Sequence, residues 1–142
     1  MTFSLNIKTA ADLLAAARID AKRDMIAFLD EFTATLRQGY TVDEVASWPT
    51  KATQARAFLA GGDAGLMLAA EAQSTGQDLT SVATYIVQRA DAFEALMGRV
   101  AGWRITAATQ IEAAQDAAAV QMALQNTKAA AVAWIAAAGL NG

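Results

Sequence analysis

Apolar residues recur along most of this chain at spacings of three and four, which is the period of an amphipathic helix. Roughly a quarter of the residues are alanine, and alanine buries little area per residue. The helices must therefore approach closely, or partners must cover part of the apolar surface. The sequence predicts an all-α fold: a helical bundle with a long antiparallel helical pair, shorter connecting helices and an alanine-rich C-terminal helix.

Capping residues and glycines mark the expected helix boundaries. Capping boxes begin at Thr9 and Thr41, and aspartates at positions 78 and 116 can cap two later helices. Pro49 separates a single turn at 42–46 from the helix that follows it. The expected helices cover residues 10–38, 48–60, 64–73, 79–114 and 117–138, and glycines at 39, 61, 76 and 139 end four of them.

Two glycines four residues apart, Gly98 and Gly102, interrupt the longest periodic run. We expect them to permit a close helix crossing, the alternative being a mild kink or local softness of the helix. The buried stripes of the two long helices are predicted at Leu14, Met25, Phe28, Leu29, Phe32 and Leu36, and at Val82, Ile86, Phe93, Met97, Val100, Ala107 and Ile111.

Three regions are expected: an extended N-terminal segment (1–8), a helical domain (9–115) and a C-terminal helix (116–142). The last helix is only weakly amphipathic, so we expect it to bury little against its own domain and to serve oligomerisation or docking. The alternative is a marginal surface helix. The predicted protein–protein interface residues are Val120, Leu124, Trp134, Ile135 and Leu140. Trp134 is the expected exposed anchor, whereas Trp103 is expected in the core and Trp48 to lock a turn.

The composition argues against catalysis. The chain contains no histidine and no cysteine, so serine–histidine and thiol nucleophiles and disulfides are excluded. Asp30–Glu31 and Asp43–Glu44 are adjacent in sequence and therefore point to different helix faces. Phosphate-binding and calcium-binding loop motifs are also missing. We predict no enzyme activity, no catalytic, cofactor-binding or metal site, and no cofactor.

Charge and hydropathy limit the partners. The net charge is −3, which argues against nucleic acid as a primary partner. The basic cluster Arg18, Lys22 and Arg23 is interleaved with Asp20 and Asp24, as on an ion-paired helix face. The longest apolar stretch, 129–140, is shorter than the roughly 20 residues of a membrane span. The first residues are not those of a signal peptide, so we expect a soluble protein made in the cytoplasm.

The middle of the chain resembles small alanine-rich tail proteins of bacteriophages and prophages, described as tail-fibre assembly or tail-associated proteins. The similarity covers roughly residues 18–114 and departs from the family pattern at Thr41, Gln54 and Pro49. It rests on Arg18-Ile19-Asp20, Gly39-Tyr40, Glu44, Ser47-Trp48, Lys51, Ala55, Ala57–Ala60, Leu68–Ala72, Gly76, Leu79-Thr80, Val82-Ala83, Ile86, Phe93 and Ile111–Ala114.

This resemblance implies a non-enzymatic role through helix-mediated contacts with other phage tail proteins. The implied setting is the baseplate or tail-fibre region of the virion tail, assembled in the host cytoplasm, with the chain as a homo-oligomer. The resemblance leaves open an assembly chaperone absent from the mature virion. The residues alone leave open a cellular helical protein-binding module and an enzyme that uses carboxylates.

Overall fold

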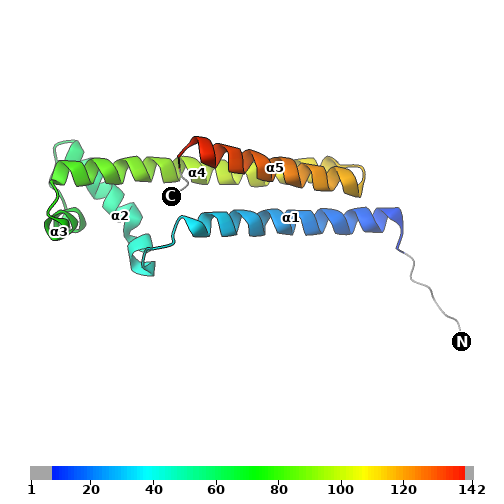
Figure 1. Cartoon of the computed structure of the whole chain (residues 1–142), viewed down its shortest axis with the longest axis horizontal. Coiled ribbons are helices and arrows are strands. Elements are labelled where there is room, and N and C mark those ends of the chain that lie inside the picture. Colours follow the sequence, from blue (N-terminus) through cyan, green and yellow to red (C-terminus); the bar gives the residue numbers. More distant parts are fainter. Residues whose placement is uncertain (1–7, 140–142) are drawn as a thin grey trace, which may run out of the picture. The chain divides into compact units, whose positions relative to one another are not determined.

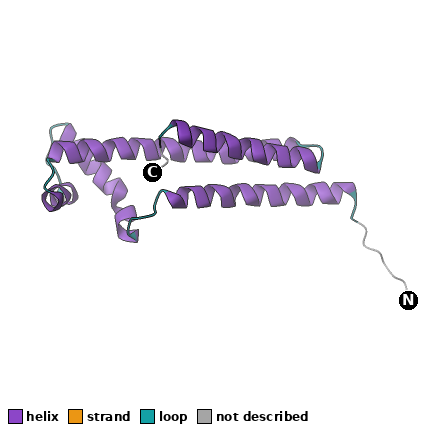
Figure 2. Cartoon of the chain, viewed as in Figure 1, coloured by secondary structure: helices purple, strands orange, loops and turns teal. Residues whose placement is uncertain are grey.

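The structure, a computed structural model, describes residues 8–139. Over that range it contains helices and no strand, which confirms the predicted all-α class (Figure 2). The predicted extended segment falls on residues 1–7, outside the described residues, and on Lys8. The helices are α1 (Ala10–Thr35), α2 (Val42–Leu59), α3 (Leu66–Thr75), α4 (Leu79–Ala113) and α5 (Ala117–Ala137) (Figure 1).

The predicted starts at Ala10, Leu79 and Ala117 are confirmed, because each depends on side chains only three residues apart. The other two helices begin at Val42 and Leu66 rather than at 48 and 64. In the first capping box, Thr9 Oγ1 accepts from the Asp12 amide at 3.1 Å, and the Asp12 carboxylate accepts from the Thr9 amide at 3.0 Å. Thr41 and Glu44 repeat this exchange at the start of α2. The aspartates before α4 and α5 accept from the amides of Ser81 and Ala119 at 3.0 and 2.8 Å.

The predicted break before Pro49 is wrong, because α2 runs continuously from Val42 to Leu59. The capping box at Thr41 starts the helix well before the proline. Pro49 then deprives only the Val45 carbonyl of its helical partner. Burial of Ala52 and Ala55, on the turns that follow, stabilises the uninterrupted helix.

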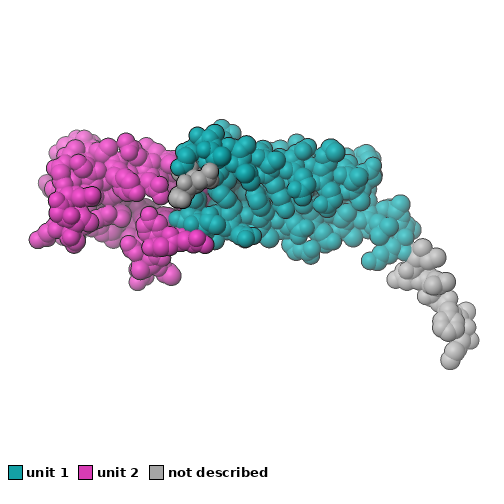
Figure 3. All heavy atoms as spheres, viewed as in Figure 1, with its two compact units in different colours: residues 1–36, 99–142 teal, residues 37–98 magenta. Residues whose placement is uncertain are grey.

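The residues form two compact units, unit 1 (residues 1–36 and 99–142) and unit 2 (residues 37–98), coloured separately in Figure 3. This division differs from the predicted one at residue 116, because α5 belongs to the same unit as α1. The C-terminal part of α4 and α5 form an antiparallel hairpin through the short connection at 114–116, and α1 lies along α5 in the same direction (Figure 1).

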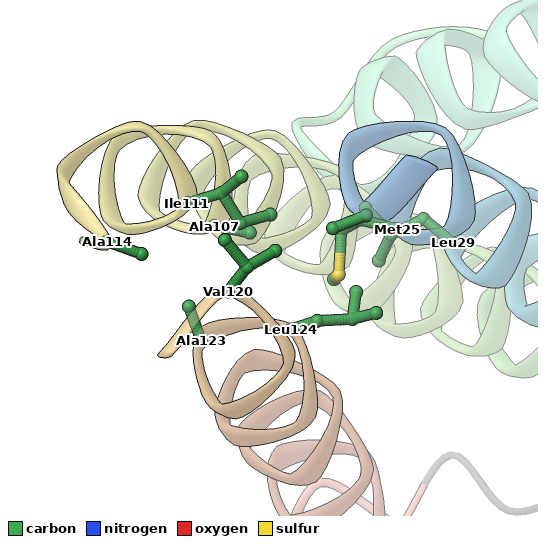
Figure 4. Packing of buried hydrophobic residues seen from close by; sticks show 9 residues of the cluster. Met25, Leu29, Ala107, Ile111, Ala114, Val120, Ala123 and Leu124 are labelled. Carbon is green, nitrogen blue, oxygen red and sulfur yellow. The ribbon is translucent and has the colours of Figure 1, made fainter. Parts of the chain in front are cut away.

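The core of unit 1 is built by α1, α5 and the C-terminal part of α4. Met25 and Leu124 point towards one another, and Val120 points towards Ala107 and Ile111 (Figure 4). The buried cluster comprises Ala21, Met25, Leu29, Ala107, Ile111, Ala114, Val120, Ala123 and Leu124. Alanines fill a large share of it, as expected for helices in close approach.

Unit 2 has its own core between α2, α3 and the N-terminal part of α4. Its buried residues are Ala52, Ala55, Leu68, Ala72, Val82, Ala83 and Ile86. Trp48 packs edge-on against both Tyr40 and Phe93, with ring centroids 5.2 and 5.7 Å apart. The predicted turn at Trp48 and Pro49 is wrong, because both residues lie inside α2; the contact with Tyr40 instead joins α2 to the turn that precedes it.

The expected close crossing at Gly98 and Gly102 is wrong. A Cβ atom added at either position would meet no atom within 4 Å. No neighbouring helix therefore approaches so closely that these positions must lack a side chain. The two lie instead in an exposed stretch of α4.

Candidate interaction surface

The carboxylates with a displaced pKa have structural roles. The Thr9 amide lowers the pKa of Asp12, and the Thr41 amide lowers that of Glu44, because each donates a hydrogen bond to the charged form. The Lys22 ammonium does the same for the pKa of Glu112 across the α1–α4 contact. These three carboxylates cap helices or join them. Within residues 8–139, no group of three side chains of the kinds that bind metals lies close together.

A shallow depression in unit 2 is lined by Glu71, Gln77, Asp78, Ser81, Val82 and Tyr85. Its two carboxylates are already bound: Glu71 pairs with Lys51 at 2.9 Å, and Asp78 caps α4. A ligand would have to displace these contacts. The depression therefore offers a weaker candidate site than the helix surfaces.

Three predicted interface residues, Val120, Leu124 and Ile135, are buried inside unit 1, with no more than 4% of each exposed. The expectation that the C-terminal helix buries little against its own domain is wrong. These side chains are among the larger apolar groups of α5, and their burial supplies apolar area to the core of its own unit. They are not accessible to a partner while unit 1 keeps this packing. Leu140 lies outside the described residues.

Trp134, the expected exposed anchor, is half-buried. Its ring meets the ring of Trp103 edge-on, with centroids 5.9 Å apart, and the Arg99 guanidinium lies 5.7 Å from the Trp134 centroid. Trp103 packs against the core of unit 1, in line with its predicted core role. Trp134 thus joins α5 to α4 within unit 1 and leaves only part of its surface outside.

The outward side of α5 carries a second regular stripe. Its members are all exposed and follow one another at spacings of four and three, which is the a/d pattern of a coiled-coil seam. They are Ala118, Met122, Gln125, Ala129, Val132 and Ala136, which we call the neutral face. Met122 and Val132 are 65% and 56% exposed and are its largest apolar groups.

No member of the neutral face is charged, and Lys128 is the one charged residue of α5. The Lys128 ammonium lies 5.4 Å from the Phe28 ring centroid, off the neutral face and against α1. The surfaces of α1 and α2 differ, because they carry paired charged side chains: Arg23 pairs with Asp20 on α1, and Arg56 of α2 pairs with Asp91 of α4. The first of these pairs matches the expected ion-paired face of α1.

The sequence contains the signal for the neutral face, since the spacing and the missing charges can be read directly. Side-chain size does not separate the two sides of α5, because Val120 is buried whereas Met122 and Val132 are exposed. The position of each residue in the helical repeat decides which side it takes.

Comparison with known proteins gives no relative: no family model, no curated protein and no solved structure matches this chain. Among residues 8–139, no helix has both the length and the hydropathy needed to cross a lipid bilayer.

Proposed function

We propose that this chain is a non-enzymatic structural protein that acts through protein–protein contacts made by the neutral face of α5. The observation that carries this proposal is the continuous stripe of six exposed, uncharged residues at coiled-coil spacing. A seam of this kind fits another helix, because knobs from one helix enter holes in the other. Its alanines let two backbones approach closely.

The partner that we propose first is a second copy of the chain. A copy presents the same uncharged face, so the contact brings no like charges together. Burying the remaining surface of Met122 and Val132 contributes about 1 kcal/mol for each side chain, given about 1.5–3 kcal/mol for complete burial. Association itself costs at least about 4 kcal/mol. The contact must therefore extend along the whole seam, over about 30 Å for a helix of this length.

The biological setting that we propose is the tail of a bacteriophage, in the baseplate or tail-fibre region. Its support is the resemblance of residues 18–114 to small alanine-rich tail proteins. A structural role is compatible with what the carboxylates do: Asp12 and Glu44 cap helices, and Glu112 joins α4 to α1. Mass spectrometry of purified virions tests this setting: the chain should be present at a fixed ratio to known tail proteins. Its absence from virions would favour an assembly chaperone.

The contact itself is tested by placing charge on the neutral face. We expect the wild-type chain to form oligomers in sedimentation equilibrium, and Met122→Glu with Val132→Glu to be monomeric with unchanged helicity. The matched control is Asn126→Glu with Ala130→Glu, which puts two charges on exposed positions of α5 beside the seam. The control should still associate. A monomeric wild-type chain at high concentration, or equal loss in both variants, would contradict the proposed contact.

A further inference from the structure

Gly98 and Gly102 weaken α4 without serving its packing. Both lie in the interior of the helix, and a methyl group at either position would find open space. Glycine in a helix interior is less favourable than alanine by about 1 kcal/mol. Alanine is the commonest residue of this chain, yet at these two positions the helix carries the residue that destabilises it.

The same stretch of α4 has only partial support from neighbours: Val100 and Trp103 are partly buried against the core of unit 1, and the other side chains contribute little. Upstream, Val82 and Ile86 lie in the core of unit 2; downstream, Ala107 and Ile111 lie in the core of unit 1. Between the buried residues at 96 and 107, no side chain of α4 is fully buried. Helix stability in proteins comes mainly from packing of a buried face. Intrinsic propensity therefore matters most here, where the glycines lower it.

The boundary between the two units crosses α4 within this stretch, at Gly98 and Arg99. The other connection between the units, residues 36–41, is not helical and contains Gly39 at φ +88°. It has no helical hydrogen bonds that must break before it changes conformation. The helix is therefore the connection that limits movement of one unit against the other.

We propose that residues 98–102 of α4 form a flexible joint, at which the helix opens locally and the two units change their relative orientation. Local opening is expected where buried contacts are few and backbone hydrogen bonds are exposed. The joint would let a protein that assembles through unit 1 adapt the direction of unit 2. The inference goes beyond the proposed contact and does not depend on it.

Hydrogen exchange of the full chain tests the local opening. Amides of residues 98–106 should show lower protection than those of residues 84–92 and 108–113 in the same helix. In the variant Gly98→Ala with Gly102→Ala, protection in this stretch should rise about fivefold for each substitution, as about 1 kcal/mol implies. Ala101→Gly should have the opposite effect. Equal protection along α4 in the wild-type chain would overturn the proposal.

Spin-label distances test the movement itself. The chain lacks cysteine, so Gln73→Cys and Asn126→Cys place one exposed label in each unit. Labelled protein is diluted with unlabelled protein, so that distances between copies do not contribute. We expect a broad distance distribution that narrows in the double alanine variant and broadens with Ala101→Gly. A distribution of equal width in all three would overturn the joint, even if hydrogen exchange slowed.

Discussion

Arg18 Nη2 donates a hydrogen bond of 2.7 Å to the carbonyl oxygen of Ala114 and so ties α1 to the turn between α4 and α5. The Arg18 Nε atom is buried without a partner in the described structure. The beginning of α1 is thereby attached to the corner at which the hairpin of unit 1 reverses. Lys22 and Glu112 add an ion pair close to the same corner.

Replacing Arg18 with alanine should destabilise unit 1 by about 1–2 kcal/mol, because the partly buried Ala114 carbonyl loses its charged donor. The matched control is Arg23→Ala on the same helix, whose pairs with Asp20 and Asp24 are exposed. That change should cost less than about 0.5 kcal/mol. Urea unfolding followed by circular dichroism measures both, and equal losses would contradict a special role for Arg18.

Shortening a side chain to alanine should have different effects on the two faces of α5. Leu124→Ala should cost about 2–5 kcal/mol, since Leu124 is 2% exposed in the core of unit 1. Met122→Ala should change the stability of the monomer by less than about 0.5 kcal/mol, because that side chain is mostly exposed. Thermal unfolding of dilute protein compares them. A tolerated Leu124→Ala would mean that α5 does not pack on unit 1 in this way.

Because α5 packs in the core of unit 1, deleting it should destabilise that unit. The sequence suggested a helix that buries little against its own domain. In the structure, deletion of residues 117–142 removes Val120 and Leu124 and uncovers Ile111. We expect the truncated chain to lose the helical signal of unit 1 and to retain slow hydrogen exchange in the core of unit 2. Hydrogen exchange measured by mass spectrometry follows the amides of unit 1 and unit 2 separately. Protection of the α1 amides in the truncated chain would refute this expectation.

The start of α3 depends on one side chain from α2. Gln54 Oε1 accepts from the amides of Met67 and Leu68 at 3.0 and 3.2 Å, and so caps a helix that lacks a capping side chain of its own. Gly65 makes room for it, because a Cβ there would come within 2.5 Å of Gln54 Cδ.

Gly65→Ala should therefore destabilise unit 2 by more than Gly76→Ala. Both glycines have positive φ, but open space surrounds Gly76. The cost at Gly76 is the strain of the left-handed helical backbone alone, about 1 kcal/mol. At Gly65 the backbone lies at φ +73° and ψ +164°, a region that essentially only glycine adopts, so the strain is larger, and the lost cap adds about 1 kcal/mol. Gln54→Ala should reproduce the second part. Urea unfolding followed by circular dichroism measures all three variants, and equal effects of the two glycine changes would argue against the cap.

Acid should weaken the fold through its caps and ion pairs. The folded-state pKa values of Asp12, Glu44 and Glu112 lie below the ordinary values of 3.8, 4.5 and 4.5. Folding therefore favours the charged forms, and this stability is present above the unfolded pKa and is lost as the pH falls through the folded one.

We expect the melting temperature to be steady above about pH 5 and to fall below about pH 4.5. Asp12→Asn with Glu44→Gln should flatten the decline, because these variants no longer take up protons at the two caps. Asp63→Asn serves as the matched control at an exposed loop position. A decline of equal steepness in all three proteins would show that the caps do not cause it.

The sequence by itself determined the all-α class and the starts of α1, α4 and α5. A capping box such as Thr9 with Asp12 needs only atoms within three residues, and the glycine that ends α3 needs only its own φ of +69°. Such interactions are local, so they can be read without knowing what lies nearby.

Only the tertiary structure decided which side of α5 is covered, that Pro49 stays inside a helix, and that Gly98 and Gly102 meet no neighbour. Alanine gives a weak hydrophobic contrast between helix faces, so the pattern in α5 is compatible with more than one buried side. The contacts of Val120 and Leu124 with residues of α1 and α4 select one of them. That choice depends on side chains distant in sequence, and it leaves the neutral face exposed.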